Sequence, residues 1–209
     1  MKKIITLLAL AAPIIFSILV YRQLPDILVT HWGINGTANG YSQKLVGVSL
    51  LPIISIVVFL IAQIIPKVDP NKVNIAKFKN TYDSFIAAIL LFMAYVHVLM
   101  LSWNLGYSFD IVQLLTPALS ILFLVISNVL TKVRQNWFIG IRTPWTLSSE
   151  IVWNKTHALG AKLFKVVAII TLIEVIFPKL SFYFLMIPII SVAIYTVGYS
   201  YFLYSKLKK

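Results

Sequence analysis

Cysteine and acidic residues are the side chains that this chain lacks or nearly lacks: its 209 residues include no cysteine and only six Asp or Glu. Without cysteine there is no disulfide, no thiolate metal site and no cysteine nucleophile. The sequence also has no phosphate-binding glycine-rich motif and no zincin-type histidine pair. We therefore expect a protein that is not an enzyme and uses neither a cofactor nor a metal.

Charge of either sign is scarce, whereas apolar residues are abundant. Charged side chains make up 11% of the sequence, against about 25% in soluble domains, and 60% of the residues are hydrophobic. A soluble chain of this length could not bury so much apolar surface in one core. The composition therefore indicates a membrane protein, in which a net charge of +12 marks one side of the bilayer and not direct nucleic-acid binding.

Six apolar runs meet the length of about 20 residues that a membrane-spanning helix requires. They are Ile4–Tyr21, Val46–Ile65, Phe85–Trp103, Ile111–Leu130, Ala158–Phe177 and Phe182–Tyr204. None shows the alternating pattern of an outer-membrane barrel, and backbone groups in lipid must be satisfied within the segment. The sequence therefore predicts an all-α fold, a polytopic bundle of six transmembrane helices.

The first apolar run has two interpretations. Lys2 and Lys3 before it, with Ala9 and Ala11 inside it, resemble a cleavable signal peptide. The run continues past that site to Val20, however, which favours a helix that is retained as the first span.

Lys and Arg are distributed unevenly between the two sides of the predicted bundle. Fifteen of the 18 lie at the chain ends or in and beside the connections after the second and fourth runs. They are Lys2, Lys3, Lys67, Lys72, Lys77, Lys79, Lys132, Arg134, Arg142, Lys155, Lys162, Lys165, Lys206, Lys208 and Lys209. The opposite side holds Arg22, Lys44 and Lys179. Because positive charge stays in the cytoplasm, both termini are predicted to be cytoplasmic.

The long outer connection, residues 22–45, is rich in turn-forming residues. Glycines and asparagines at positions 33, 35, 36, 39 and 40 allow tight turns, and Trp32 and Tyr41 suit the membrane–water interface. Two interpretations stay open. The loop is either a compact cap anchored by aromatic side chains or an extracellular recognition surface.

The long inner connection, residues 131–157, carries three of the five tryptophans. Pro144 disfavours a helical conformation at the residue before it, and Ser148 is positioned to cap a helix that has Glu150 in its first turn and continues into the fifth span. Arg142 has two possible roles. It contacts lipid phosphate at the inner leaflet, or it anchors the carboxylate or phosphate of a docking partner.

Two ionisable residues, His97 and Glu174, fall inside predicted spans, where such groups are candidates for function. Both lie in the outer half, so they are placed to pair with each other or to meet His31 and Asp110. An interhelical hydrogen bond is one interpretation and a metal site another, although no closely spaced ligand pair supports a metal. A polar site near both residues would favour an alternative function, a small transporter or lipid-handling protein.

The two long loops resemble a known family. The segment Asn136 to His157, with the string Gly140–Leu147 and Trp153, is similar to the signature of the SdpI-type immunity family. The segment from Pro25 through His31-Trp32-Gly33 to Lys44 resembles the N-terminal module that accompanies it. The resemblance implies two modules: residues 1–65, with two helices and loop 22–45, and residues 66–209, with four helices and loop 131–157.

The resemblance also implies a function. It is that of a bacterial plasma-membrane protein that protects its producer from a secreted antibacterial peptide or protein toxin; for the best-known member of the family the resemblance also implies signalling by capture of a cytosolic transcriptional repressor. Membrane lipids are the remaining expected partner. The candidate toxin-recognition residues are Pro25, His31, Trp32, Gly33, Asn35, Gly36, Gly40, Tyr41 and Lys44. The candidate docking residues for the cytosolic partner are Asn136, Gly140, Arg142, Thr143, Pro144, Trp145, Thr146, Trp153 and His157.

Overall fold

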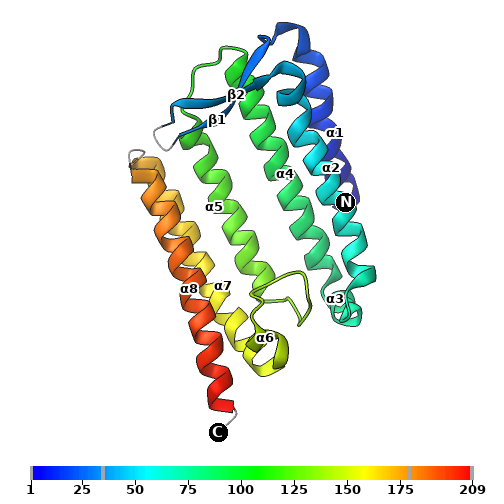
Figure 1. Ribbon diagram of the computed structural model, residues 1–209, viewed down its shortest axis with the longest axis vertical. Helices are drawn as coiled ribbons and strands as arrows, with labels where there is room; N and C mark the ends of the chain where they lie inside the picture. Colours follow the sequence, from blue (N-terminus) through cyan, green and yellow to red (C-terminus); the bar gives the residue numbers. More distant parts are fainter. Residues whose placement is uncertain (1, 34–35, 178–179, 208–209) are drawn as a thin grey trace.

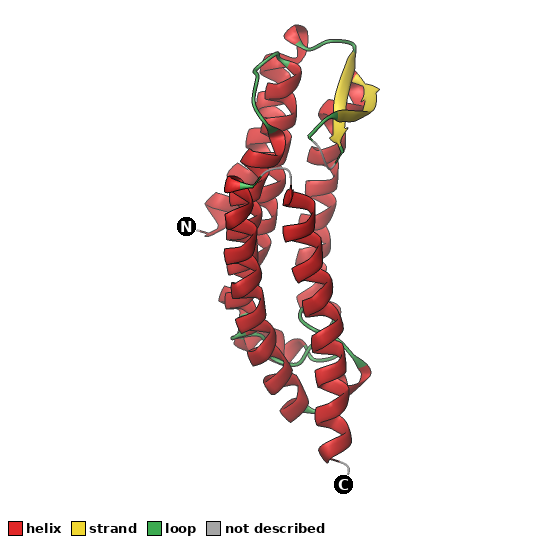
Figure 2. Cartoon of the chain, turned by 90° about the vertical axis from the view of Figure 1, so that its left-hand side faces the viewer, coloured by secondary structure: helices red, strands yellow, loops and turns green. Residues whose placement is uncertain are grey.

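The computed structural model describes residues 2–33, 36–177 and 180–207, and most of them are helical. The long helices are α1 (Lys2–Val20), α2 (Lys44–Val68), α4 (Lys79–Asn104), α5 (Ile111–Leu130), α7 (Glu150–Ile173) and α8 (Ser181–Leu207). The short ones are η1 (Tyr21–Gln23), α3 (Lys72–Lys77), α6 (Pro144–Ser148) and η2 (Glu174–Ile176). The long helices run along the long axis, with a hairpin at one end and α6 at the other (Figures 1 and 2).

Five helices within the described residues are long and apolar enough to cross a membrane, namely α1 continued by η1 as Lys3–Gln23, α2, α4, α5 and α8. An all-α membrane bundle therefore fits the structure. The sixth predicted run, Ala158–Phe177, lies in α7 and η2 and is not among the five. Helix α7 carries Glu150 and three lysines, which is more charge than any other long helix carries.

The outer connection corrects the purely helical prediction. Strands β1 (Ile27–Trp32) and β2 (Ala38–Gln43) form a two-stranded antiparallel sheet, with Ile27 opposite Gln43 and irregular pairing around His31. The sequence of β1, Ile-Leu-Val-Thr-His-Trp, consists mostly of β-branched and aromatic residues, which favour strands. The prediction of a turn-rich loop did not identify this strand.

The helices pack in two groups. Helices α1 and α2 pack on α4 below the hairpin, while α7 lies between α5 and α8, and α4 adjoins α5 (Figure 1). The largest apolar cluster joins the groups through buried residues that include Tyr82, Leu90, Leu130 and Trp153. The predicted module boundary at 65/66 falls inside α2, and the two-module division stays a prediction.

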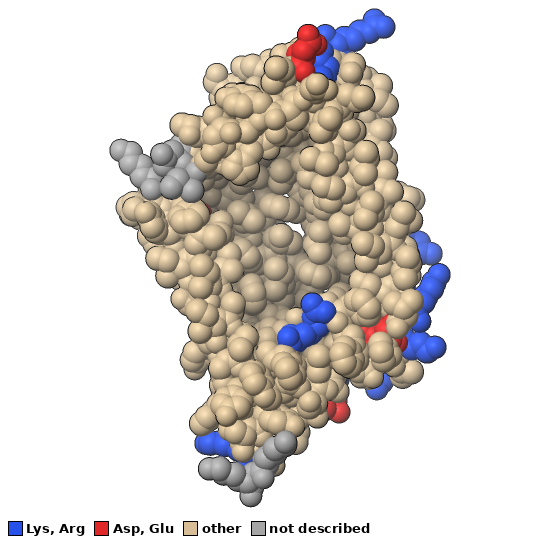
Figure 3. Space-filling model, viewed as in Figure 1, with Lys and Arg blue, Asp and Glu red and all other residues tan. Residues whose placement is uncertain are grey.

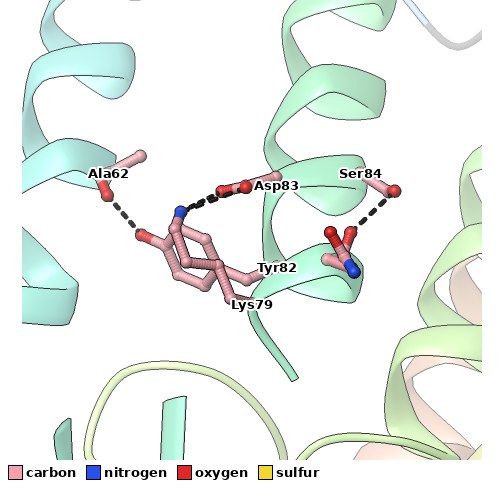
Figure 4. Close-up of polar contacts among 6 residues, drawn as sticks. Ala62, Lys79, Tyr82, Asp83 and Ser84 are labelled. Atoms are coloured by element: carbon pink, nitrogen blue, oxygen red, sulfur yellow. Dashed lines mark hydrogen bonds and ion pairs between the residues drawn. The ribbon is translucent and has the colours of Figure 1, made fainter. Parts of the chain in front are cut away.

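The ends of α2 and α4 nearest α6 are joined by a polar contact. Tyr82 of α4 donates its hydroxyl to the carbonyl oxygen of Ala62 in α2 at 2.6 Å, beside the Lys79–Asp83 ion pair at 2.8 Å (Figure 4). Figure 3 shows one face of the molecule, hollowed in its middle, with most of the visible Lys and Arg side chains in the half toward α6. The hairpin thus lies at one end of the bundle, and most of the Lys and Arg side chains visible on this face lie toward the other end (Figure 3).

Candidate functional site

The outer hairpin rests on a small apolar cluster. Leu28 of β1 is fully buried among Val20, Leu24, Val48 and Leu101. It lies so close to α2 that a Cβ on Gly47 would come within 2.8 Å of its Cδ1 atom. The hairpin is therefore fixed on the ends of α1, α2 and α4.

The side chain of Asn104, at the end of α4, binds the outer edge of β1. Its Oδ1 accepts a hydrogen bond from the Val29 amide at 2.8 Å, and its Nδ2 donates to the Val29 carbonyl at 2.9 Å and to that of Met100 at 2.8 Å. One amide side chain thus satisfies backbone groups that would otherwise lie unpaired at a strand edge. Sequence reasoning missed Asn104, because its partner is 75 residues away.

Several predicted recognition residues shape the hairpin itself. Lys44 makes an ion pair with Asp26 at 3.2 Å, and its backbone amide donates to the Asp26 carbonyl at 2.8 Å. Gly40 faces His31, where a Cβ would come within 2.7 Å of the His31 Cβ. Gly36 has a φ of 71°, which favours glycine. Asn35 lies outside the described residues.

The hairpin borders a cleft of about 590 Å³. Predicted residues His31, Trp32 and Gly33 line it, and further lining comes from Thr37, Asn39, Val112, Ser181 and Phe182. The His31 Nδ1 atom is 2.6 Å from the Asn39 Oδ1 atom. Trp32 packs edge-on against Trp103 at 5.6 Å, and its buried Nε1 has no acceptor among the described residues. The ring of Trp32 thus lines the cleft, but its unpaired N–H is itself buried.

The remaining predicted outer residues lie away from this cleft. Pro25 lines a separate cleft of about 570 Å³ together with Trp103 and Tyr107. Tyr41 is 62% exposed on β2. Some of the predicted recognition residues therefore lie on exposed surfaces, and others hold the hairpin in shape.

The inner loop is held by side chains that bind its own backbone. Asn136 is fully buried, its Oδ1 accepts from the Phe138 and Ile139 amides, and its Nδ2 donates to the Arg134 and Ile139 carbonyls, all within 2.7–2.9 Å. Gln135 donates through Nε2 to the carbonyls of residues 146 and 147, each at 2.8 Å. These bonds fix residues 134–139 without regular secondary structure.

Helix α6 begins with a reciprocal cap. Thr143 accepts from the Thr146 amide at 3.1 Å, and Thr146 accepts from the Thr143 amide at 2.8 Å. Thr143 is extended, as Pro144 predicts, with φ −118° and ψ 162°. The predicted cap of α7 was wrong by one residue. Ser149 accepts from the Val152 amide, while Ser148 binds the Pro144 carbonyl, a contact that uses its hydroxyl within α6.

Trp153 and His157 of α7 bind the inner loop from the other side. Their rings stack at 4.0 Å, and Trp153 donates through Nε1 to the Val133 carbonyl at 3.1 Å. His157 donates through Nδ1 to the Trp153 carbonyl at 2.8 Å and accepts at Nε2 from the Ile141 amide at 2.9 Å. These roles require the neutral imidazole, and burial lowers the pKa of His157 to about 4, against an opposing effect of the Trp153 carbonyl. The histidine thus acts as a fixed link between α7 and the loop.

The inner loop also contacts the chain before and after it. Buried Asp69, just after α2, accepts from the Trp137 amide at 2.9 Å and from the Asn71 amide at 2.6 Å. On α8, Ser200 bonds to Thr143 at 3.0 Å, and Tyr201 packs against Trp145 at 5.0 Å. Sequence reasoning missed Asp69, whose lone acidic position gave no signal for a partner so far along the chain.

Few of the predicted docking residues are on the surface. Five are buried and hold the loop together: Asn136, Thr143, Thr146, Trp153 and His157. Arg142 and Pro144 are exposed, and Gly140 and Trp145 are half-buried. Arg142 donates through Nη1 to the Trp137 carbonyl at 2.6 Å. A partner can contact the buried five only through the shape that they give the loop.

His97 and Glu174 have separate partners. The His97 Nε2 atom is 2.7 Å from the Ser17 hydroxyl of α1, while Thr116 of α5 donates to Glu174 at 3.4 Å. Both are buried, at 0% and 2% exposure, and neither lines any of the clefts described here. No group of three metal-binding side chains occurs in the described part of the chain. The His97 Nδ1 and Glu174 Oε1 atoms are buried without partners among the described residues, and the two side chains lie in different helix groups, so the structure does not bring them together in one shared site.

Comparisons with known proteins bear on the same two loops. Residues 132–200, which span the inner loop and much of α8, match the SdpI/YfhL protein family, and residues 8–56 match a domain of unknown function (DUF1648). A Bacillus subtilis (strain 168) protein named Immunity protein SdpI is 26% identical over 207 residues, or 99% of this chain and 97% of that protein. No solved structure matches the chain. The resemblance indicated by the loop motifs is therefore confirmed, and the chain is similar along nearly its whole length to an immunity protein of the SdpI type.

Proposed function

We propose that this chain is a bacterial membrane immunity protein that protects its producer from a secreted antibacterial peptide or protein toxin. The observation that carries the proposal is the similarity to Immunity protein SdpI over 99% of the chain. The family signature also coincides with the residues that build the inner loop, which indicates that the two proteins share this structure.

The proposed topology is six spans in the bacterial plasma membrane, with α7 as the additional span and both termini cytoplasmic. Helix α7 packs between α5 and α8, so it lies within the bundle and not beside it. The uneven distribution of Lys and Arg supports this orientation, because it places the hairpin outside and α6 inside.

The toxin-binding surface is proposed to be the hairpin cleft. The indole of Trp32 lines this cleft, beside the ring of His31 and the amide of Asn39. The Trp32 Nε1 is buried without an acceptor, which costs free energy, and a toxin carbonyl would recover that cost if binding turned the ring toward the cleft. The rigid support by Asn104 preorganises this surface.

Repressor capture is proposed for the inner loop, with Arg142, Pro144 and the exposed rings of Trp137 and Phe138 as the contact surface. Helix α2 connects the two sides directly. It begins at Lys44, next to β2, and ends at Val68, next to Asp69, which binds the inner loop. Its 25 residues span about 37 Å, so a single helix links the hairpin to the inner loop.

A protection assay tests the proposal. The chain is expressed in a sensitive strain, which is challenged with a panel of secreted toxins that begins with any toxin encoded beside the gene. The growth-inhibiting toxin concentration is expected to rise. Trp32→Phe removes the N–H donor and should lower it again by about 3–10-fold, the loss of one hydrogen bond. Trp103→Phe is the matched control, because it alters the other ring of the pair and leaves the donor in place.

Signalling is measured separately with a repressor-controlled reporter. Arg142→Ala should reduce reporter output while protection is retained, and Lys155→Ala on α7 serves as the charge-matched control. Absence of protection against every toxin on the panel, at equal membrane abundance, would refute the immunity function. Equal reporter output in the two variants would refute the proposed docking surface on the inner loop but would leave the immunity function standing.

A further inference from the structure

A wide cleft lies between α4, α5 and α7 toward the end of the bundle that holds α6. Its volume is about 1370 Å³, larger than the about 300–1,000 Å³ of common small-molecule pockets. Phe78 and Leu124 supply apolar wall, and Asn128 and Asn154 supply amides. Of the candidate site residues that the structure describes, only His157 lines it, and His157 is bonded to the inner loop.

Basic side chains outnumber acidic ones in the lining. Five contribute positive charge: Lys77, Lys132, Arg134, Lys162 and Lys165. Glu150 is the one acidic residue lining the cleft. In the part of the chain that the structure describes, none of the five lies within ion-pair distance of a carboxylate, and Lys77 alone has a recorded side-chain bond, to Asn74 at 3.2 Å. Like charges in a concave site repel one another and concentrate a field that attracts anions.

The depth of the lysines identifies the kind of anion. Lys162 and Lys165 lie four and seven residues inside the predicted span that begins at Ala158, or about 6 and 10 Å along the helix axis. A cation at that depth is costly unless it reaches the interface or meets an anion. The long lysine side chains can extend back to the interface, where a phospholipid carries its phosphate, and its acyl chains can lie against the apolar wall beside them.

We propose that the cleft between α4, α5 and α7 binds an anionic phospholipid of the adjacent leaflet, with its headgroup phosphate among Lys132, Arg134, Lys162 and Lys165 and its acyl chains against Leu124. The site is separate from the hairpin cleft and from the exposed inner-loop surface, and it does not depend on the immunity function. The bound lipid would neutralise the repulsion among cations contributed by α7 and the start of the inner loop.

The test uses the full chain purified in a neutral detergent, with lipid binding counted by native mass spectrometry. Phosphatidylglycerol should bind more tightly than phosphatidylcholine. Lys162→Gln/Lys165→Gln should weaken phosphatidylglycerol binding about tenfold or more, because each basic residue near a lipid surface contributes to the attraction. Lys155→Gln/Lys206→Gln removes the same charge from positions outside the cleft and should leave binding within about twofold of the unchanged protein.

Three outcomes would overturn the proposal: equal binding of both lipids, equal weakening in the two double variants, or displacement of the lipid by inorganic phosphate at similar concentration. The last result would mean that the cleft takes a free anion. If Lys162→Gln/Lys165→Gln unfolds, Lys132→Gln/Arg134→Gln gives the same comparison outside the helices. Glu150→Gln removes the opposing charge and should tighten binding, and weakened binding there would also count against the site.

Discussion

Pro66, inside α2, lacks the backbone N–H that would otherwise bond to the carbonyl of Ala62. Tyr82 of α4 supplies the missing donor from a different helix. A proline that would weaken an isolated helix is thereby tolerated, and the same contact joins α2 to α4. The pair shows how a local deficit in the sequence is corrected by a residue that only the fold brings near.

Tyr82→Phe is expected to lower the free energy of unfolding by about 1–3 kcal/mol, since it leaves a buried carbonyl without a partner. Thermal unfolding in detergent, followed by circular dichroism, measures the effect. Tyr195→Phe on the exposed face of α8 makes the same chemical change without a recorded hydroxyl bond, and should stay within about 0.5 kcal/mol of the original. A neutral Tyr82→Phe would show that the Ala62 carbonyl needs no donor from α4.

Gly140→Ala is expected to destabilise the inner loop. Gly140 has a φ of 119°, and an added Cβ would collide with the Nε2 atom of His157. Backbone strain alone costs about 1–3 kcal/mol. The matched control is Gly198→Ala in α8, where nothing lies within 4 Å of the new Cβ and where alanine should stabilise the helix by up to about 1 kcal/mol. Similar melting temperatures for the two variants would contradict this account of the signature glycine.

At the scale of elements, the sequence located the helices well and the contacts between loops poorly. The predicted run Ile111–Leu130 coincides with α5, because apolar length is a local property that lipid demands. The hairpin was missed, since glycine and asparagine drew attention to turns while the strand run Ile27–Trp32 lay beside them. Asp69 and Asn104 could not be found from one sequence, because each binds backbone that is 68 or 75 residues away.

The link between α2 and the inner loop gives a prediction at this scale. Asp69→Asn replaces a carboxylate that accepts two backbone amides with a group that has one acceptor oxygen, and a hydrogen bond to a charged group contributes about 1.5–3 kcal/mol. The Trp137 amide should therefore exchange with deuterium faster, and the melting temperature should fall. Asp83→Asn, which breaks only the exposed pair with Lys79, should cost no more than about 0.5 kcal/mol. If the Trp137 amide exchanged at the same rate in Asp69→Asn, the proposed link from the hairpin through α2 to the inner loop would be refuted.

At the scale of the whole molecule, the crossing of α7 decides the topology. If α7 spans the membrane, the segment after it faces the medium and the end of α8 faces the cytoplasm. If α7 does not span, these two positions exchange sides. The four charged side chains of α7 argue against a crossing, whereas its packing between α5 and α8 favours one. The basic cleft reconciles the charge of α7 with a membrane crossing, because Lys162 and Lys165 line it.

Single-cysteine labelling tests this crossing directly, since the natural chain has no cysteine and each variant carries one thiol. A membrane-impermeant maleimide applied to intact cells should label Tyr41→Cys on the hairpin and Leu180→Cys after α7, both of them exposed positions. Ser148→Cys in α6 and Leu207→Cys at the end of α8 should react only after permeabilisation. The opposite pattern at 180 and 207, with 41 and 148 unchanged, would mean that α7 stays on one side. In that case Lys162 and Lys165 would need no lipid phosphate to stabilise their charge.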